Sequence, residues 1–151
     1  MSKLPLTFSE LPAVTSVLPH RPPFLMVDRV VELREGHLTS LRTFRADEPF
    51  FSGHFPGHPV VPGVLLVEGL AQTMAYYALF HQSAPRVLLV GMDRVRFRSV
   101  VETGMEVTFE VEVGEQRFGL LAGRGRVRVG TRKVAEATLK GFAGKPGRAL
   151  G

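Results

Sequence analysis

The 151-residue chain is predicted to fold as an α+β domain in which an antiparallel sheet of about six strands wraps around one apolar helix. One observation is a stretch of helical length, residues 63–80, that is apolar nearly all round and carries a single carboxylate. Another is the period-two pattern after residue 85, which repeats in four segments separated by glycine-containing turns. The third is length, because 151 residues suffice for one sizeable core but not for two. We therefore expect a single domain over residues 1–151, with its core at about 10–143.

The chain before the central helix is predicted to contain a short helix and a pair of strands. The short helix lies around Glu10–Val17 and ends at the turn LPHRPP, residues 18–23, because the prolines cannot continue a helix. The run FLMVDRVVEL, residues 24–33, then predicts a strand. A tight turn at Gly36 leads into a second strand over about 37–45.

A long connection, residues 47–63, joins these strands to the central helix and carries four prolines. In a compact domain, a connection of this length is more often functional than idle. The helix over 63–80 has Glu68, Gln72 and Thr73 as its clear polar residues, so we expect the sheet to enclose it. Its length approaches that of a membrane span, but the central glutamate and the strands that follow argue against one.

Four strands are predicted after the helix. The pattern is clearest in MEVTFEVEV, where apolar and polar residues alternate without a break. The residues after the last strand, 144–151, are predicted to form a disordered tail. The four predicted strands are 87–97, 105–113, 116–129 and 133–142.

The composition is that of a soluble globular protein, with 44% apolar and 22% charged residues. The chain has no cysteine, which excludes disulfides, thiolate nucleophiles and thiolate metal ligands and suits a reducing compartment. The N-terminal segment MSKLPLTFSELPAV lacks the apolar run of a signal peptide, so a cytoplasmic location is expected.

The net charge of +5 comes largely from arginines at alternate positions of two predicted strands. This spacing puts the three arginines of each strand on one face. Such a face is typical of a solvated outer surface, and docking of an acidic partner is the alternative. Nucleic acid is not expected as a partner, because no aromatic residues alternate with the arginines to stack on bases. The two sets are Arg94, Arg96 and Arg98, and Arg124, Arg126 and Arg128.

Glu68 is the first candidate catalytic residue. Its neighbours one helical turn away are Val64, Leu65, Ala71 and Gln72, none of which is basic. A carboxyl group in apolar surroundings favours its protonated form, which a general acid needs. The alternative is an ion pair with an arginine from elsewhere in the fold.

His54 is the second candidate. It lies in a loop rich in glycine and proline, where an uncharged imidazole is accessible and can act as a base near neutral pH. The alternative is an ordinary surface-loop histidine. His58 follows four residues later, but Pro56 prevents the helix that would let this spacing hold a metal, so no metal site is expected.

The third element is Pro62-Gly63 at the start of the helix. Free N–H groups at a helix N-terminus favour an oxygen atom that gains negative charge, and a glycine lets a ligand approach the backbone closely. Alone, this pair is equally consistent with an ordinary loop-to-helix junction. A base, an acid and an oxyanion donor together predict proton abstraction next to a carbonyl group.

The segment GHFPGHPVVPGVLLVEGLAQ, residues 53–72, resembles the central motif of the FabZ-type (3R)-hydroxyacyl-acyl-carrier-protein dehydratases of type II fatty acid synthesis, which have the hot-dog fold. Glutamate at position 68, where the isomerising sister enzymes have aspartate, favours the non-isomerising type. Shorter segments extend the resemblance to about residues 10–143. They are LPHR (18–21), PFL (23–25), VDRV (27–30), DEPFF (47–51), GMD (91–93), RFR (96–98) and VAEA (134–137).

The resemblance implies dehydration of a (3R)-hydroxyacyl-acyl-carrier-protein to trans-2-enoyl-acyl-carrier-protein and water. It implies that His54 and Glu68 are the catalytic residues and come from different subunits of a homodimer, or of a trimer of dimers. The substrate is then carried on phosphopantetheine, and no metal or redox cofactor is needed. The acidic carrier protein is expected to dock on Arg94, Arg96 and Arg98. Substrate contacts are expected from the Gly63 amide, which would polarise the thioester carbonyl, and from Phe55, Pro62, Val64 and Gln72.

Two other functions are compatible with this resemblance. A hot-dog acyl thioesterase would hydrolyse the same class of thioester, and a non-catalytic protein would only bind it. The chain also departs from the usual family pattern at Pro22, where an aromatic residue is common, and at His58. These departures make a specialised pathway, such as polyketide or polyene synthesis, an alternative to fatty acid synthesis.

Overall fold

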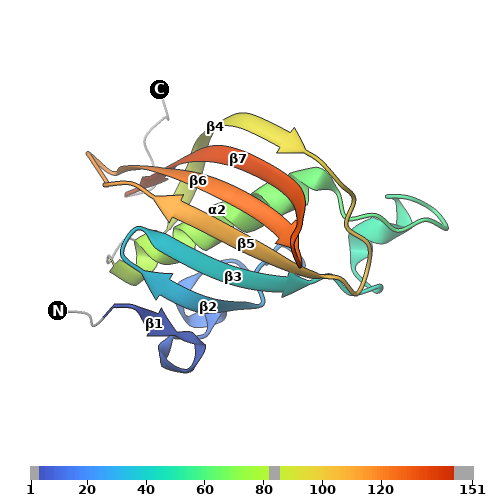
Figure 1. Cartoon of the computed structure of the whole chain (residues 1–151), viewed down its shortest axis with the longest axis horizontal. Coiled ribbons are helices and arrows are strands. Elements are labelled where there is room, and N and C mark those ends of the chain that lie inside the picture. The colour runs from blue at the N-terminus through green and yellow to red at the C-terminus, as the bar shows by residue number, and fades with distance from the viewer. Residues whose placement is uncertain (1–3, 82–85, 145–151) are drawn as a thin grey trace.

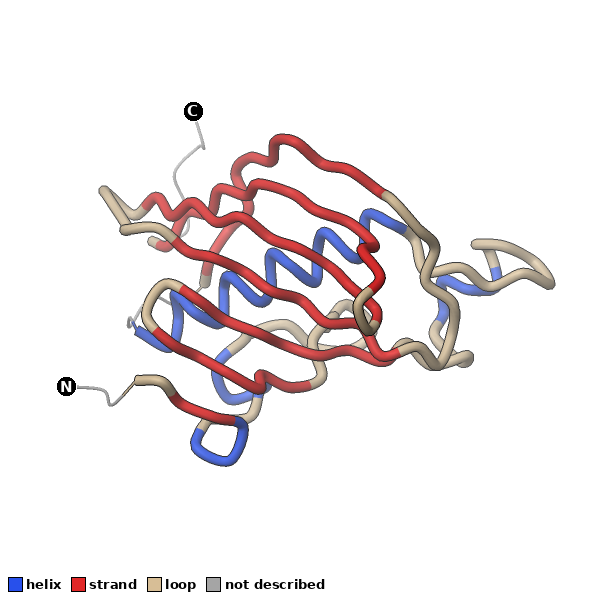
Figure 2. The backbone as a smooth tube through the Cα atoms, viewed as in Figure 1, coloured by secondary structure: helices blue, strands red, loops and turns tan. Residues whose placement is uncertain are grey.

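The structure is a computed structural model that describes residues 4–81 and 86–144. Within these residues, seven strands form one sheet that curves around a 19-residue helix, α2 (Gly63–His81) (Figure 1). All neighbouring strands are antiparallel, in the order β1-β2-β3-β5-β6-β7-β4. The helix runs diagonally behind the central strands (Figure 2). This is the α+β hot-dog arrangement that the sequence predicts.

The elements before α2 are short and include two 3₁₀ helices. They are β1 (Leu6–Thr7), η1 (Phe8–Glu10), α1 (Val14–Val17), β2 (Arg29–Arg34), β3 (His37–Thr43) and η2 (Pro49–Ser52). After α2 come four long strands. They are β4 (Val87–Phe97), β5 (Glu106–Val113), β6 (Leu120–Val129) and β7 (Arg132–Ala143).

The central helix and the strands β4, β5 and β7 lie within one residue of their predicted bounds. The sheet has one strand more than expected, the two-residue β1, which pairs with β2. Apart from Gly144, the predicted tail 144–151 lies outside the described residues. The strand predicted over 24–33 begins only at Arg29, because the amides of Phe24 and Leu25 both donate to the Arg21 carbonyl in a turn.

The start of β6 also differs from the prediction. The strand begins at Leu120 rather than at residue 116. Arg117 and Leu120 exchange backbone hydrogen bonds, and Phe118 and Gly119 between them have positive φ angles. A positive φ breaks an extended strand, so residues 116–119 form a tight turn instead.

The inner face of the sheet packs directly on α2. A β-carbon added at Gly69 would lie 2.2 Å from the Phe109 ring of β5, so this helix position accepts only glycine. By length and composition α2 could cross a membrane, but 56% of its most apolar window is buried inside the protein. The sheet therefore covers this helix, which forms the centre of the core as predicted.

The N-terminal segment closes the side of the core that the sheet leaves open. Glu68, Gln72 and Tyr76 are four residues apart and share one face of α2. The Tyr76 hydroxyl donates to the Pro12 carbonyl at 2.7 Å, and burial raises the pKa of Tyr76 to about 12, so this donor keeps its proton. Further along the segment, the Met26 amide donates to Gln72. These bonds hold the segment against the face of α2 that carries Glu68.

Strand β4 is an open edge of the sheet. It is last in the strand order, and within the described residues it pairs only with β7. Edge strands with unpaired backbone groups and exposed apolar side chains are typical places for a second chain to pair. The exposed apolar residues of β4 are Leu88, Leu89, Val90, Met92 and Phe97.

Candidate active site

Glu68 opens into a small pocket between α2 and the edge strand β4. The pocket has a volume of about 190 Å³, and the Glu68 side chain is 20% exposed. Seven of the ten lining residues have a non-polar side chain or none, and His20, Glu68 and Gln72 form the polar part of the wall. The lining residues are His20, Glu68, Ala71, Gln72, Met74, Ala75, Val87, Leu88, Leu89 and Gly141.

Gln72 fixes the orientation of Glu68. Its Oε1 accepts a hydrogen bond from the Met26 amide at 2.7 Å, so its Nε2 must point the other way. Nε2 donates to the Phe24 carbonyl at 2.8 Å and to Glu68 Oε1 at 2.9 Å. The assignment of the amide atoms is settled by the backbone, and Oε1 of Glu68 is therefore held as an acceptor.

The predicted alternative for Glu68, an arginine partner, is not what the structure contains. Within residues 4–81 and 86–144, the one basic side chain in ion-pair range of Glu68 is His20, whose Nε2 lies 4.0 Å from Oε1. The carboxyl group thus has an amide donor and an imidazole beside it, and it otherwise faces the pocket.

His54 lies in the connection between β3 and α2, in the loop that follows η2. Its Nδ1 lies 2.7 Å from the Val60 carbonyl oxygen. Because a carbonyl can only accept, Nδ1 carries the proton, and Nε2 of the uncharged ring is the free basic nitrogen. No group within the described ranges forms a hydrogen bond with this Nε2. The loop therefore presents His54 in the tautomer that a general base needs.

His54 and Glu68 are not brought together within one chain. The pocket at Glu68 does not include His54, and no contact joins the two side chains. A larger groove, of about 700 Å³, lies between the N-terminal segment and the loop before η2, and it includes neither residue. The loop that carries His54 extends away from the sheet at one end of the molecule (Figure 1).

The remaining predicted substrate contacts surround the start of α2. Gly63 is the first helical residue, so its N–H has no partner within the helix. A β-carbon at Gly63 would lie 2.7 Å from the Phe97 ring of β4, so glycine allows the edge strand to approach the helix start. Phe55 and Val64 are exposed and Pro62 is half-buried. Of the predicted substrate-contact residues, only Gln72 lines the pocket at Glu68.

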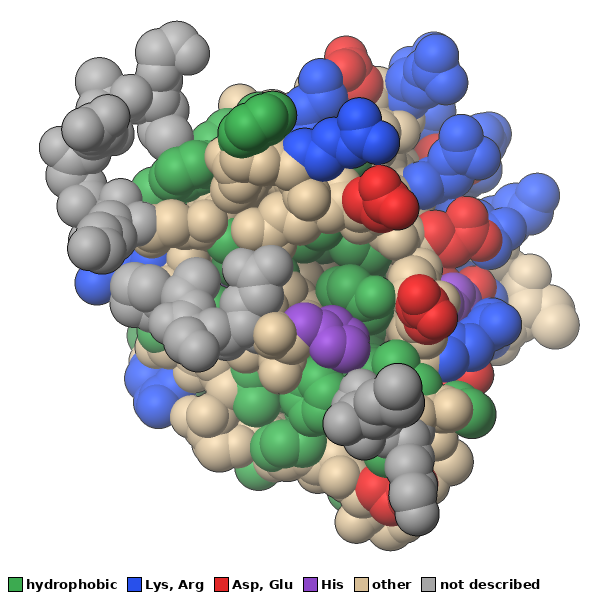
Figure 3. All heavy atoms as spheres, turned by 90° about the vertical axis from the view of Figure 1, so that its left-hand side faces the viewer, with side chains coloured by type: hydrophobic (Ala, Val, Ile, Leu, Met, Phe, Trp, Pro, Cys, Tyr) green, Lys and Arg blue, Asp and Glu red, His purple; other side chains and the backbone are tan. Residues whose placement is uncertain are grey.

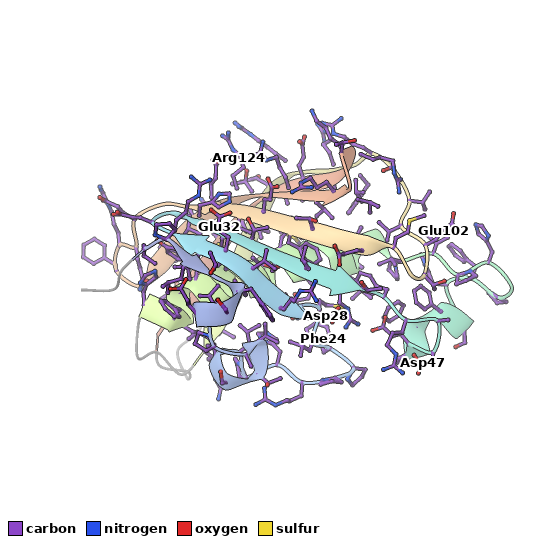
Figure 4. The ribbon with its side chains drawn as sticks, turned by 60° about the horizontal axis from the view of Figure 1, so that its bottom comes forward. Phe24, Asp28, Glu32, Asp47, Glu102 and Arg124 are labelled. Carbon is purple, nitrogen blue, oxygen red and sulfur yellow. The ribbon has the colours of Figure 1, made fainter. Side chains whose placement is uncertain are left out.

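The arginines lie on the outer face of the sheet, opposite α2. Charged side chains of both signs gather along this side of the molecule (Figure 3), and Arg124 projects from the side of the sheet opposite to Phe24 (Figure 4). Three of the six arginines are in ion pairs, since Arg98 lies 2.6 Å from Glu136, Arg128 lies 2.8 Å from Glu110 and Arg126 lies 3.8 Å from Glu110.

Arg94 differs from its neighbours on this face. The pairing of β4 with β7 shifts register between Asp93 and Arg96, and Arg94 has a φ of 52°. Strict alternation along the strand, as predicted, therefore fails at Arg94. Arg94 and Arg98 nevertheless line the same outer groove, and Arg94 has no ion-pair partner within the described ranges.

His20 is the site residue that sequence reasoning missed. The sequence places it in a turn 48 positions before Glu68, and no spacing rule connects the two residues. The only sequence signal was its place in the LPHR segment of the family resemblance.

The described ranges hold no group of three or more His, Asp or Glu side chains arranged to bind a metal ion.

Comparison with known proteins places this fold and these residues in a family. The sequence model of the FabA-like domain matches residues 18–138. The 3-hydroxyacyl-[acyl-carrier-protein] dehydratase FabZ of Desulforamulus reducens is 43% identical over 133 residues, which cover 86% of this chain and 94% of that protein. The FabZ proteins of Caldanaerobacter subterraneus and Variovorax paradoxus are 40% and 39% identical, covering 83% and 88% of this chain and 92% and 93% of those proteins.

Solved structures agree on the fold. The dehydratase heterocomplex ApeI:P from Xenorhabdus doucetiae superposes with a TM-score of 0.80 at 18% identity, covering 90% of this chain and 93% of that chain. The Escherichia coli PaaI protein of the phenylacetic acid degradation operon superposes with a TM-score of 0.59 at 15% identity, covering 77% and 78%. At these identities the likeness concerns the fold alone. Taken with the match over residues 18–138 and the 39–43% identical relatives, it leads to one conclusion: the chain belongs to the FabA-like family, and within it to the FabZ dehydratases.

Proposed function

We propose that the protein is a 3-hydroxyacyl-[acyl-carrier-protein] dehydratase, a hydro-lyase of fatty acid biosynthesis or of a related polyketide or polyene pathway. The observation that carries the proposal is the 39–43% identity to FabZ dehydratases over more than four fifths of the chain. The geometry adds a histidine held as a base and a carboxyl group that faces a pocket between α2 and the edge strand β4.

The proposed reaction is an elimination in which His54 and Glu68 divide the proton transfers. Nε2 of His54 removes the proton from C2 of the 3-hydroxyacyl thioester. Electrons of the C2–H bond form the C2=C3 double bond, and the C3–O bond breaks. Protonated Glu68 gives its proton to the departing hydroxyl group, which leaves as water. The Gly63 amide stabilises the negative charge that gathers on the thioester oxygen, and no metal or redox cofactor takes part.

We infer that the site is completed by a second copy of the chain. The pocket at Glu68 is walled by Val87, Leu88 and Leu89 of β4, which is the open edge of the sheet. A second chain that pairs along β4 would lie directly over this opening. His54 of one protomer then faces Glu68 of its partner, and a homodimer, alone or as a trimer of dimers, is the functional unit.

The substrate arrives on the phosphopantetheine arm of an acyl carrier protein, and the reaction takes place in the cytoplasm. Carrier proteins of this type are acidic, and Arg94, Arg96 and Arg98 offer positive charge beside β4. Arg94 and Arg96 are better placed than Arg98, because Arg98 is paired with Glu136 and neither of the other two has an ion-pair partner in the described chain. The acyl end of the substrate enters the pocket at Glu68, where Met74 lines the wall while Tyr77 and Phe80 do not.

The direct test is a product assay with purified protein and carrier-linked (3R)-hydroxyacyl substrates of several chain lengths. The expected product is the trans-2-enoyl thioester, detected by mass spectrometry as a loss of 18 Da, with the thioester intact. Free acid as the product would identify a thioesterase instead. Binding without turnover of either 3-hydroxyacyl or enoyl thioesters would identify a non-catalytic binding protein. Either result would overturn the proposal.

A further inference from the structure

Glu68 has a titratable neighbour to which the proposed mechanism gives no role. His20 Nε2 lies 4.0 Å from Glu68 Oε1, and both side chains line the same pocket. They are the only titratable residues among its lining. Their exposed fractions are nearly equal, 21% for His20 and 20% for Glu68, so the two groups share one sheltered environment.

The turn that carries His20 is built to hold the ring in place. The guanidinium group of Arg21 donates to the carbonyls of Thr15, Leu18 and His20 itself, at 3.0, 2.8 and 2.7 Å. The ring of Phe24 stacks on the imidazole, with centroids 6.5 Å apart and an interplanar angle of 26°. A surface histidine needs none of this support, whereas a residue that must keep a set distance to a carboxyl group does.

The second nitrogen of His20 shows that its charged form is disfavoured. Nδ1 is buried and has no hydrogen-bond partner in the described residues. Buried polar atoms are nearly always paired, and an unpaired one points to a functional constraint. If the ring were protonated, this nitrogen would be an unpaired buried N–H of a cation, which is less favourable still. Burial accordingly lowers the pKa of His20, although the Glu68 carboxylate raises it and Arg21 lowers it further.

The two carboxyl oxygens of Glu68 differ in their contacts. Its Oε1 already accepts from Gln72, and Oε2 has no hydrogen bond within the described ranges. The carboxyl group therefore has one fixed oxygen, next to His20, and one free oxygen for the substrate. The distance of 4.0 Å exceeds that of a hydrogen bond, but catalytic contacts of this kind often shorten when the substrate binds.

We propose that His20 is a positioning residue for Glu68, and that the two form a pair that holds one proton and presents it to the substrate's departing hydroxyl group. The proposal rests on the proposed function, since it assigns a partner to the acid of that reaction. When the proton leaves with the hydroxyl group as water, Glu68 is a carboxylate and the neutral His20 does not compensate its charge. The pair then regains one proton from solvent before the next turnover. A second proton would give a cationic His20 beside the protonated acid and is disfavoured by the buried Nδ1.

The pair predicts a specific pH dependence. The charged and titratable groups that face His20 are Glu68 on α2 and Arg21 in its own turn, and Gln72 and the rest of the pocket wall are uncharged. Acidification adds a second proton to the pair and leaves Glu68 protonated, so it does not remove the acid. As the pH rises, the pair loses its single proton, and Glu68 can then no longer protonate the departing hydroxyl group. The alkaline side of the wild-type pH profile of kcat therefore reports the proton of the pair.

The first experiment measures kcat, KM and the pH profile of the His20→Asn and His20→Leu variants with a carrier-linked 3-hydroxyacyl substrate. His20→Leu is expected to lower kcat by about tenfold or more while KM changes less than about twofold. His20→Asn restores part of this loss, because an amide can contact Glu68. Its alkaline limb is expected to move to lower pH, because the one-proton state loses the form in which His20 carries the proton. His81→Asn is the control, since burial lowers the pKa of His81 as it does that of His20, but His81 is exposed at the end of α2 and lies outside the pocket.

The second measurement does not depend on activity. The titration midpoint of the His20 ring, followed by NMR of histidine-labelled protein, is expected to fall by about one pH unit in the Glu68→Gln variant, because the carboxylate that favours the imidazolium is gone. An unchanged midpoint would overturn the pairing, as would a His20→Asn variant with the kcat and the alkaline limb of the wild-type protein. A parallel loss of kcat and rise of KM with an unchanged pH profile would show a merely structural role. An inactive wild-type protein would refute the proposed dehydratase separately, while the NMR shift would still decide the pairing.

Discussion

The two halves of the candidate site are built in opposite ways. His54 lies on a loop, and its ring forms one side-chain hydrogen bond, from Nδ1 to the Val60 carbonyl. Its Nε2 has no hydrogen-bond partner in the described chain. Glu68 lies on the central helix, in a pocket where Gln72 and His20 fix it from two sides. His54 is thus exposed on a loop, whereas Glu68 lines a pocket.

This difference explains why a single chain is not enough. The loop that carries His54 projects from the sheet, so its imidazole can reach a substrate bound to another chain. The pocket at Glu68 opens at the unpaired edge of β4, where a second chain can pair and cover it. The two features are complementary in direction as well as in chemistry. In a dimer that pairs along β4, the second chain would cover the open strand edge. The same dimer would bring the free imidazole nitrogen of His54 to the pocket of its partner.

The largest expected effect tests this division of the site directly. His54→Ala and Glu68→Gln should each lower kcat by about a thousandfold or more, because each removes one of two proton transfers that act as a unit. When the two inactive variants are unfolded, mixed in equal amounts and refolded, activity should return to roughly a quarter of the wild-type value. Half of the dimers are then mixed, and each mixed dimer has one intact site.

The mixing experiment discriminates sharply between arrangements. If His54 and Glu68 of the same chain formed the site, no mixture would contain an intact one, and the activity would stay at the level of the variants. Mixing each variant with itself after the same treatment is the control. Size-exclusion chromatography of both variants before and after mixing shows whether assembly is preserved.

A charge placed on the open edge should separate assembly from folding. Met92 lies in the middle of β4 and is 57% exposed in the single chain, so Met92→Lys puts a cation where a second sheet is proposed to pair. We expect a shift to monomer in analytical ultracentrifugation and a loss of activity of about tenfold or more, with an unchanged far-ultraviolet circular dichroism spectrum.

Phe118→Ser is the matched control for this variant. Phe118 is 98% exposed, on the turn that precedes β6 rather than on the edge strand. This change should leave both the mass and the activity as they are. A dimeric and fully active Met92→Lys protein would contradict the proposed interface.

The sequence was sufficient to predict the fold because the strongest signals in this chain are periodic. An apolar helix with one carboxylate and four alternating strands leave few ways to bury the apolar faces, and the structure has that arrangement. What the pattern could not provide are the breaks in it. The late start of β2 follows from a turn closed by Arg21, and the late start of β6 follows from the positive φ of Phe118 and Gly119. Backbone geometry of this kind leaves little trace in hydrophobic spacing.

The site was predictable only in part, for a related reason. Glu68 was conspicuous because a carboxylate on an apolar helix is costly, and His54 because of its glycine- and proline-rich loop. His20 carries no such mark, since its contact with Glu68 spans 48 residues and depends on the path of the N-terminal segment across α2. Gln72 was expected to touch the substrate, and in the structure it lines the pocket. Its three hydrogen bonds go to Glu68 and to the backbone of that same segment, a supporting role that the sequence did not indicate.

The smallest expected effect concerns how the substrate reaches the two halves. The outer face contains arginines that are paired with glutamates and others, Arg94 among them, that have no ion-pair partner in the described chain, so the unpaired ones have charge to offer an acidic carrier. Arg94→Ala should raise KM for a carrier-linked substrate by about threefold at low salt, leave kcat unchanged, and leave KM for a pantetheine thioester unchanged. Arg128→Ala, which removes a charge paired with Glu110, is the matched control and should change neither. The difference between the two variants should vanish as salt is raised, because the contact is made at the surface, where ions screen it. If KM for the pantetheine thioester rose as well, Arg94 would affect the site at Glu68 rather than bind the carrier protein. The docking role proposed for Arg94 would then be wrong.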